Sequence, residues 1–118
     1  MSFVEILKEM REKDRKYFED PDNYMKRIKA EAEKLLGEGV RVLLFGSVVE
    51  GRHLRGRSDI DVLIIGEKVP KTMRGKAEIW VEILRRLGDP FAPFEFHLVT
   101  PNEFEEWYSK FIKKYKEF

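Results

Sequence analysis

The sequence contains no cysteine in its 118 residues, which excludes disulfides, thiol catalysis and every zinc site built on thiolates. It also lacks an excess of charge, because 23 basic residues offset 22 acidic ones. A balanced chain has no long-range field that attracts nucleic acid, so we expect small ligands or a protein partner instead. The N-terminal segment lacks the basic start and long apolar run of a signal peptide, which indicates a cytoplasmic protein without membrane contact.

What the chain does contain is 42% hydrophobic residues, enough for the core of one domain. Apolar spacing predicts two amphipathic helices within residues 3–36. Ser2 and Glu5 have the spacing of a capping box for the first helix, and Asp22 is placed to cap the second. Gly37 is placed to end the second helix as a C-cap. We expect a single domain that begins with these two helices.

Three apolar runs predict strands at residues 40–45, 60–65 and 94–100. Helical spacing from Ala77 to Leu87 predicts a helix between the last two strands. Thr100, Pro101 and Glu103 combine an N-cap, a first-turn proline and a capping-box acid, which predicts a final helix over 101–117. The order α-α-β-β-α-β-α indicates an α/β (α+β) fold, with a small mixed sheet of three or slightly more strands flanked by helices.

Two aspartates, Asp59 and Asp61, stand where the second predicted strand begins. Side chains alternate along a strand, so we expect both carboxylates on one face, where like charges repel each other. A nearby positive charge must offset this repulsion, or the groups take up protons. Mg²⁺ binds one or two carboxylates together with water and phosphate oxygens. The pair therefore predicts a site for a divalent metal and a nucleotide.

Gly46 and Ser47 directly follow the first predicted strand. Glycine lets the backbone approach a ligand closely, and neighbouring N–H groups can hold a phosphate if a helix begins there. Ser47 adds a hydroxyl donor. Eleven residues separate Ser47 from Asp59, enough for a short helical turn and a returning loop. Together, the Gly-Ser pair and the two aspartates are the strongest functional signal in the chain.

The segments FGS (45–47) and SDIDVLI (58–64) resemble the Gly-Ser and Asp-x-Asp signature of the nucleotidyltransferase fold. The short chain is similar to the minimal, antitoxin-type members of that family. The resemblance covers residues 40–100 and implies that they form the catalytic core. It further implies that Gly46 and Ser47 hold the triphosphate of ATP. Asp59 and Asp61 would bind Mg²⁺ or Mn²⁺.

The resemblance also implies a third carboxylate, on a later strand, that binds metal and activates the acceptor hydroxyl. This position maps to Glu95. His97 lies two residues further on the same face, either at the edge of the site or as a hydrogen-bonded sheet histidine. In the loop before the aspartates, we expect Arg57 and Ser58 to contribute to nucleotide binding.

The implied reaction transfers a nucleoside monophosphate, AMP from ATP, to a hydroxyl. The family further implies a small helical HEPN-type toxin as acceptor, silenced by the modification. An alternative is an antitoxin with weak or no transfer activity that occludes its partner. Two departures favour this alternative: Glu50 stands where relatives commonly carry arginine, and Glu95 where many carry aspartate.

The final predicted helix carries an aromatic stripe that includes Trp107, Tyr108 and Phe111. We expect this stripe to pack mainly in the core. A share of it remains open to a homodimer or to another protein partner, because exposed apolar patches commonly mark contacts.

Overall fold

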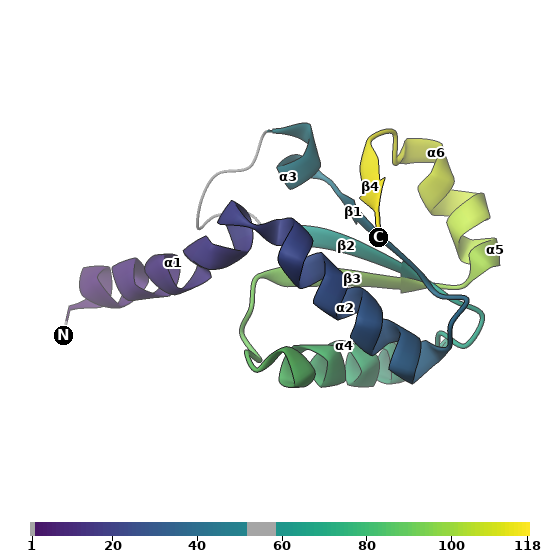
Figure 1. The fold of residues 1–118 in the computed structure, drawn as a ribbon, viewed down its shortest axis with the longest axis horizontal. Helices are drawn as coiled ribbons and strands as arrows, with labels where there is room; N and C mark the ends of the chain where they lie inside the picture. Colours follow the sequence, from purple (N-terminus) through teal and green to yellow (C-terminus); the bar gives the residue numbers. More distant parts are fainter. Residues whose placement is uncertain (1, 52–58) are drawn as a thin grey trace.

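The computed structural model describes residues 2–51 and 59–118 of the chain. In chain order its elements are α1 (Phe3–Glu19), α2 (Pro21–Leu36), β1 (Arg41–Phe45), α3 (Ser47–Glu50), β2 (Ile60–Ile65), α4 (Met73–Leu87), β3 (Phe94–Val99), α5 (Pro101–Glu103), the π-helix η1 (Phe104–Tyr108), α6 (Ser109–Phe111) and β4 (Tyr115–Glu117) (Figure 1). The predicted α+β class is confirmed. No helix in these described ranges is both long and apolar enough to cross a bilayer.

The four strands form one mixed sheet in the order β3-β2-β1-β4. β1 runs antiparallel to both β2 and β4, whereas β2 and β3 are parallel. A parallel pair needs a crossover connection, and α4 provides it. The register places Asp61 opposite Phe45 on one side and opposite Glu95 on the other.

The two faces of the sheet are covered by different helices. Even-numbered strand residues face α2 and α4 and form the larger core, with Val42, Leu44, Ile60, Val62, Ile64, Phe94, Phe96 and Leu98. Odd-numbered residues face the segment from α5 to α6 and form a smaller core of Leu43, Leu63, Ile65 and Val99. Phe104, Tyr108 and Ile112 pack against this smaller core. The alternation of side chains along a strand therefore assigns Asp61, Glu95 and His97 to the second face.

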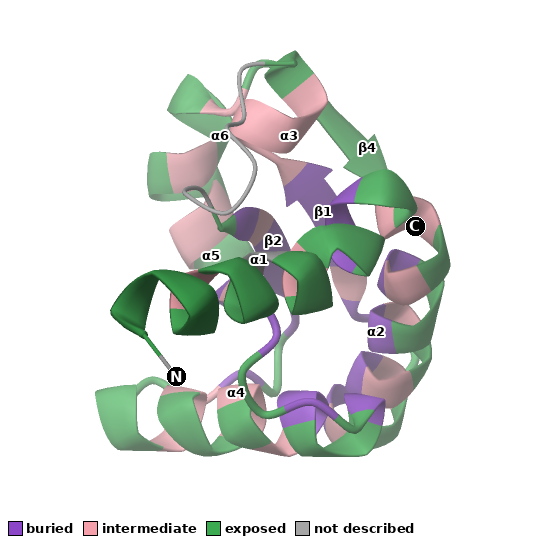
Figure 2. Cartoon of the chain, turned by 90° about the vertical axis from the view of Figure 1, so that its left-hand side faces the viewer, coloured by how far each residue is buried: buried purple, intermediate pink, exposed green. Residues whose placement is uncertain are grey.

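Helix α1 extends away from the rest of the molecule (Figure 1), and most of its surface is exposed (Figure 2). Its C-terminal part is anchored, because Tyr17 and Phe18 are buried in the larger core. The Tyr17 hydroxyl donates a 2.6 Å hydrogen bond to the buried carboxylate of Asp89. Burial raises the pKa of Tyr17, and the hydrogen bond to Asp89 raises it further. The phenol therefore stays protonated and keeps its role as donor.

The N-cap of helix α2 lies two residues earlier than predicted. The predicted N-cap, Asp22, lies inside the helix, and Asp20 is the N-cap, with its carboxylate accepting from the Asn23 N–H. Pro21 explains the shift, because proline is favoured at the first helical position and so makes the preceding residue the cap. At the other end Gly37 is the C-cap, as predicted, with φ at +97°.

The predicted final helix begins correctly but ends early. Thr100 and Glu103 form the expected capping box, yet the helical segment stops at Phe111, and the prediction that it continues to residue 117 was wrong. Tyr115–Glu117 instead pairs with β1 as an edge strand. The carboxylate of Glu117 accepts from the Arg41 guanidinium at 2.8 and 3.0 Å. This long-range pairing outweighs the local preference for helix.

Candidate functional site

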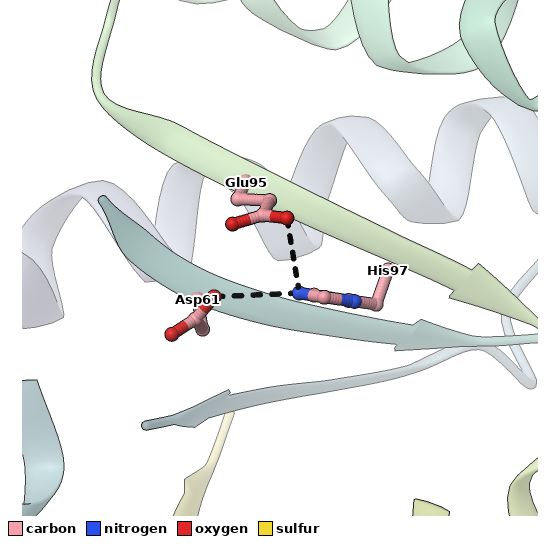
Figure 3. Close-up of side chains that lie close together, drawn as sticks. All are labelled: Asp61, Glu95 and His97. Carbon is pink, nitrogen blue, oxygen red and sulfur yellow. Dashed lines mark hydrogen bonds and ion pairs between the residues drawn. The ribbon is translucent and has the colours of Figure 1, made fainter. Parts of the chain in front are cut away.

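Three polar side chains meet on the sheet face that α5, η1 and α6 cover. Asp61 comes from β2, and Glu95 and His97 come from β3. Asp61 and Glu95 are register partners on parallel strands, and His97 follows Glu95 by two residues, so all three project from the same face. One ligand atom from each residue lies within 4.8 Å of the other two. Figure 3 shows the two carboxylates and the imidazole directed toward one another.

The Nε2 atom of His97 faces both carboxylates. It lies 3.3 Å from Oδ1 of Asp61 and 3.9 Å from Oε1 of Glu95 (Figure 3). The side chains of His97 and Asp61 are 24% and 25% exposed, and that of Glu95 is 45% exposed. The cluster is thus accessible to a ligand from solvent, with Glu95 on its open side.

Aromatic rings hold the imidazole in place. The ring of Phe45 lies 5.2 Å from the His97 ring and that of Tyr108 lies 5.9 Å away, both in edge-on contact. Tyr108 is the last residue of the π-helical segment η1. Burial raises the pKa of Tyr108, and the negative charges of Glu103 and Glu95 raise it further. A neutral, packed phenol therefore limits the rotation of His97.

Gly46 approaches the cluster from the end of β1. Its φ is +80°, a conformation that side chains with a Cβ rarely adopt. A Cβ at this position would collide with the carboxylate of Asp61. Ser47 follows as the first residue of the short helix α3. The predicted close approach of backbone to site therefore occurs here; the positive φ favours glycine, and a larger residue would also displace the Asp61 carboxylate.

The remaining predicted site residues are either not part of this cluster or not among the described residues. Asp59 precedes β2 with an exposed side chain, and its carboxylate is not in the group that Asp61, Glu95 and His97 form among the described residues. Burial raises the pKa of Asp14 on α1, and the charges of Asp89 and Asp59 contribute to that rise. The carboxylates of Asp14, on α1, and Asp59 are therefore close enough for their charges to interact. Arg57 and Ser58 lie outside the described residues.

A cleft of about 250 Å³ opens beside Gly46, on the side of the segment between α6 and β4. Its lining residues come from the end of β1 and from α3 (Phe45, Gly46 and Glu50) and from α6 and the segment after it (Phe111, Ile112, Lys113 and Lys114). The two lysines are exposed, so their ammonium groups are available to an anionic ligand. Because the chain turns into β4 after α6, it brings this positive charge to the cleft that Gly46 and Glu50 also line.

The donor set fits a divalent cation. Carboxylate oxygens are the ligands that Mg²⁺ and Mn²⁺ prefer, and imidazole nitrogen suits first-row transition metals. A cation would also offset the repulsion between Asp61 and Glu95. Sequence reasoning identified the two acids but left the role of His97 open. The i, i+2 spacing of Glu95 and His97 was the available signal, whereas no local pattern indicated Lys113 and Lys114.

Fold and site together define a small α+β domain with an acidic, metal-competent cluster beside a glycine-serine turn. The family model for the nucleotidyltransferase domain matches residues 25–117. The chain belongs to the nucleotidyltransferase domain family, and it is a transferase domain.

Solved structures agree with this assignment. One crystal structure is 37% identical to this chain and has a TM-score of 0.60. The similar region covers 80% of this chain and 97% of the chain in that structure. A second structure, from Sulfolobus solfataricus, is 18% identical and has a TM-score of 0.53. The similar region covers 80% of this chain and 78% of the chain in that structure. Both carry the name "putative nucleotidyltransferase", and the second supports the fold alone. A search of curated proteins gave no match.

Proposed function

We propose that this domain transfers a nucleoside monophosphate, AMP from ATP, to a hydroxyl group of a partner protein, with Mg²⁺ or Mn²⁺ bound at the acidic cluster. The observation that carries the proposal is the meeting of Asp61 and Glu95, with Gly46 directly beside Asp61. Two acids whose oxygens lie within 4.8 Å of each other can hold one cation between them. Next to a glycine turn that a phosphate can approach, they suit a reaction between a hydroxyl and a triphosphate.

In the proposed reaction the acceptor oxygen forms a bond to the α-phosphorus while the bond from that phosphorus to the bridging oxygen breaks. Pyrophosphate leaves, and the hydroxyl proton passes to the carboxylate of Glu95. Glu95 suits this role because it is the most exposed member of the cluster, and such proton transfer contributes about 10²–10⁴ in rate. The bound cation supplies neutralisation of the charge that develops on the phosphate oxygens.

The triphosphate would lie along the Gly46-Ser47 turn. Gly46 allows the backbone to approach, and the Ser47 hydroxyl is a donor on the same turn. Lys113 and Lys114 border the adjacent cleft and supply the positive charge that four negative oxygens require. We propose Asp59 as a further carboxylate for the metal, and Arg57 and Ser58 as nucleotide-binding residues of the loop.

For the acceptor we propose a small helical protein of the HEPN type, with this chain as its antitoxin. The exposed aromatic residues Trp107 and Phe111 on the C-terminal helical segment support a protein contact close to the cleft, because exposed apolar groups mark contact surfaces. Phe111 borders the cleft beside Gly46, so a partner docked there has its hydroxyl groups near the reaction site.

The test incubates the purified protein with ATP labelled at the α-phosphate, Mg²⁺ or Mn²⁺ and the product of the neighbouring gene. The proposal expects label on the partner, and expects Glu95→Gln to lower the initial rate about 10²-fold or more. Glu78→Gln is the matched control, because Glu78 is an exposed acid on α4, the helix that covers the opposite face. Equal rates for wild type and Glu95→Gln would overturn the role of Glu95.

The second candidate function is occlusion without transfer. Glu50, at the cleft beside Gly46, favours it because its negative charge opposes triphosphate binding there. This alternative predicts a stoichiometric complex with the partner that carries no label and that forms equally well without ATP. Label on the partner would exclude it as the sole function.

A further inference from the structure

We infer that His97 is itself a metal ligand through Nε2, and that its nitrogen makes the site select a first-row transition dication, Mn²⁺, over Mg²⁺. The inference deepens the proposed function, because it concerns the metal at the same site. It also separates this chain from a site built on carboxylates alone, in which Mg²⁺ satisfies every donor.

Direction is the first argument. Nε2 of His97 is directed toward Oδ1 of Asp61 and Oε1 of Glu95, and one ligand atom of each residue lies within 4.8 Å of the other two (Figure 3). Phe45 and Tyr108 hold the imidazole ring in this orientation by edge-on contacts. A histidine that served only to fill the sheet surface would not need its Nε2 placed between two carboxylates.

Distance is the second argument. The separations of 3.3 Å to Asp61 and 3.9 Å to Glu95 exceed the 2.9–3.0 Å or so at which N–H···O hydrogen bonds are commonest. Two ligands that each lie about 2.1 Å from one ion are about 3.0–4.2 Å apart. Both observed separations fall within that interval, so Nε2 lies as far from each carboxylate oxygen as one ligand of an ion lies from another.

Donor chemistry is the third argument. Mg²⁺ takes oxygen ligands and keeps several waters, whereas imidazole nitrogen binds first-row transition metals well. In a set of two carboxylates and one imidazole, the carboxylates supply the two negative charges that neutralise a dication. The imidazole adds a nitrogen ligand that increases the affinity for Mn²⁺ more than the affinity for Mg²⁺. His97 is thus the residue that separates the affinities of the two metals.

The experiment uses the full chain, Mn²⁺ as the probe, and no nucleotide or acceptor. Pulsed electron paramagnetic resonance measures the coupling between the Mn²⁺ electron spin and the nucleus of a ligating nitrogen. Spectra are recorded for Mn²⁺ bound to the wild type, to His97→Gln and to Tyr108→Phe. We expect coupling to one imidazole nitrogen in the wild type and in Tyr108→Phe, which retains the ring packed on His97. The coupling should disappear in His97→Gln.

Titration of the same proteins gives the selectivity. The wild type should bind Mn²⁺ at least about 10-fold more tightly than Mg²⁺, and His97→Gln should lose about 10-fold in Mn²⁺ affinity with little change for Mg²⁺. If circular dichroism shows that His97→Gln is unfolded, His97→Asn takes its place, and the wild-type spectrum alone still decides the ligation.

Two results would overturn the inference: Mn²⁺ bound to the wild type without nitrogen coupling, which makes His97 a positioning residue for Asp61, or no Mn²⁺ binding at all. Neither depends on turnover. If the protein shows the coupling but transfers no label, the inference stands and the proposed function fails. If it transfers label without the coupling, the proposed function stands and the inference fails.

Discussion

The two faces of the sheet differ in how completely they are closed. Toward α2 and α4 every residue of β1, β2 and β3 is apolar and buried, and Ile60, Val62 and Ile64 have no exposed surface. Toward α5 and α6, apolar burial stops part of the way along the strands, and Asp61, Glu95 and His97 take the positions beyond it. The same strands therefore form the larger core on one face and carry the candidate site on the other, and mutations on the two faces should have separable effects.

The largest expected effect comes from the open face. Asp61→Asn should lower metal-dependent nucleotide transfer by about 10²–10³-fold or more, because it removes a charged ligand from the reaction site. Its free energy of unfolding should equal or exceed that of the wild type, since the repulsion between Asp61 and Glu95 is relieved. Initial rates with labelled ATP and urea unfolding measure the two quantities.

Asp22→Asn is the matched control for that experiment, because Asp22 is a partly exposed aspartate at the start of α2, paired with Lys116 and outside the acidic cluster. Its transfer rate should match that of the wild type. Undiminished transfer by folded Asp61→Asn protein would remove the acidic cluster from the mechanism.

The closed face should show the opposite behaviour. Ile64→Ala removes a fully buried side chain of the larger core and should cost about 2–5 kcal/mol of unfolding free energy, while Ile64→Val should cost about 0.5–1.5 kcal/mol. Both variants, when folded, should bind Mn²⁺ with wild-type affinity, because Ile64 points away from the cluster. Denaturant unfolding and metal titration test this, and a parallel loss of Mn²⁺ affinity would show that the faces are coupled.

A smaller effect concerns the anchor of α1 on the closed face. Tyr17→Phe leaves the buried Asp89 carboxylate without its 2.6 Å donor and should cost about 1–3 kcal/mol. The pKa of Tyr17 is raised above its ordinary value of 10.0, first by burial and then by the hydrogen bond to Asp89. The unfolded phenol therefore ionises at lower pH than the folded one.

The sign of the pH dependence follows from that difference. The contribution of Tyr17 is fully present below pH 10 or so and is lost as pH rises above it, because only the unfolded state then releases the proton. Wild-type unfolding free energy should fall between about pH 10 and 11 more steeply than that of Tyr17→Phe. Identical slopes for the two proteins would contradict the buried environment assigned to Tyr17.

The smallest effect is expected at the start of α5. Thr100 accepts from the Glu103 N–H through its hydroxyl, and the Glu103 carboxylate accepts from the Thr100 N–H in return. Thr100→Ala should cost about 1 kcal/mol, and Thr100→Ser should retain most of the stability. Thermal unfolding compares the two. Equal losses for alanine and serine would show that the hydroxyl is not what stabilises this helix start.

Predictability from sequence divides according to the range of the interactions. The capping box at Thr100 and the strand Ile60–Ile65 were predicted because their signals lie within a few neighbouring residues. Strand β4 was missed because its three residues are all exposed, so no apolar alternation marks them. Their strand conformation depends on pairing with β1, 70 to 74 positions earlier in the chain.

The site divides in the same way. Alternation along a strand correctly placed Glu95 and His97 on one face, and a parallel neighbour was needed to bring Asp61 beside them. The role of Asp59 stays a prediction, because it precedes the strand and alternation does not fix its direction. Lys113 and Lys114 reach the cleft only because α6 ends and the chain turns back, which local patterns did not reveal.

The central claim is that Asp61, Glu95 and His97 bind one divalent ion on the open face of the sheet. The most direct measurement is a crystal structure with Mn²⁺ and a non-hydrolysable ATP analogue, with the ion located by anomalous scattering. The account predicts one anomalous peak within about 2.0–2.3 Å of a ligand atom from each of the three residues, with the triphosphate on the Gly46-Ser47 turn. An ion bound elsewhere, or one that contacts neither Asp61 nor Glu95, would contradict it.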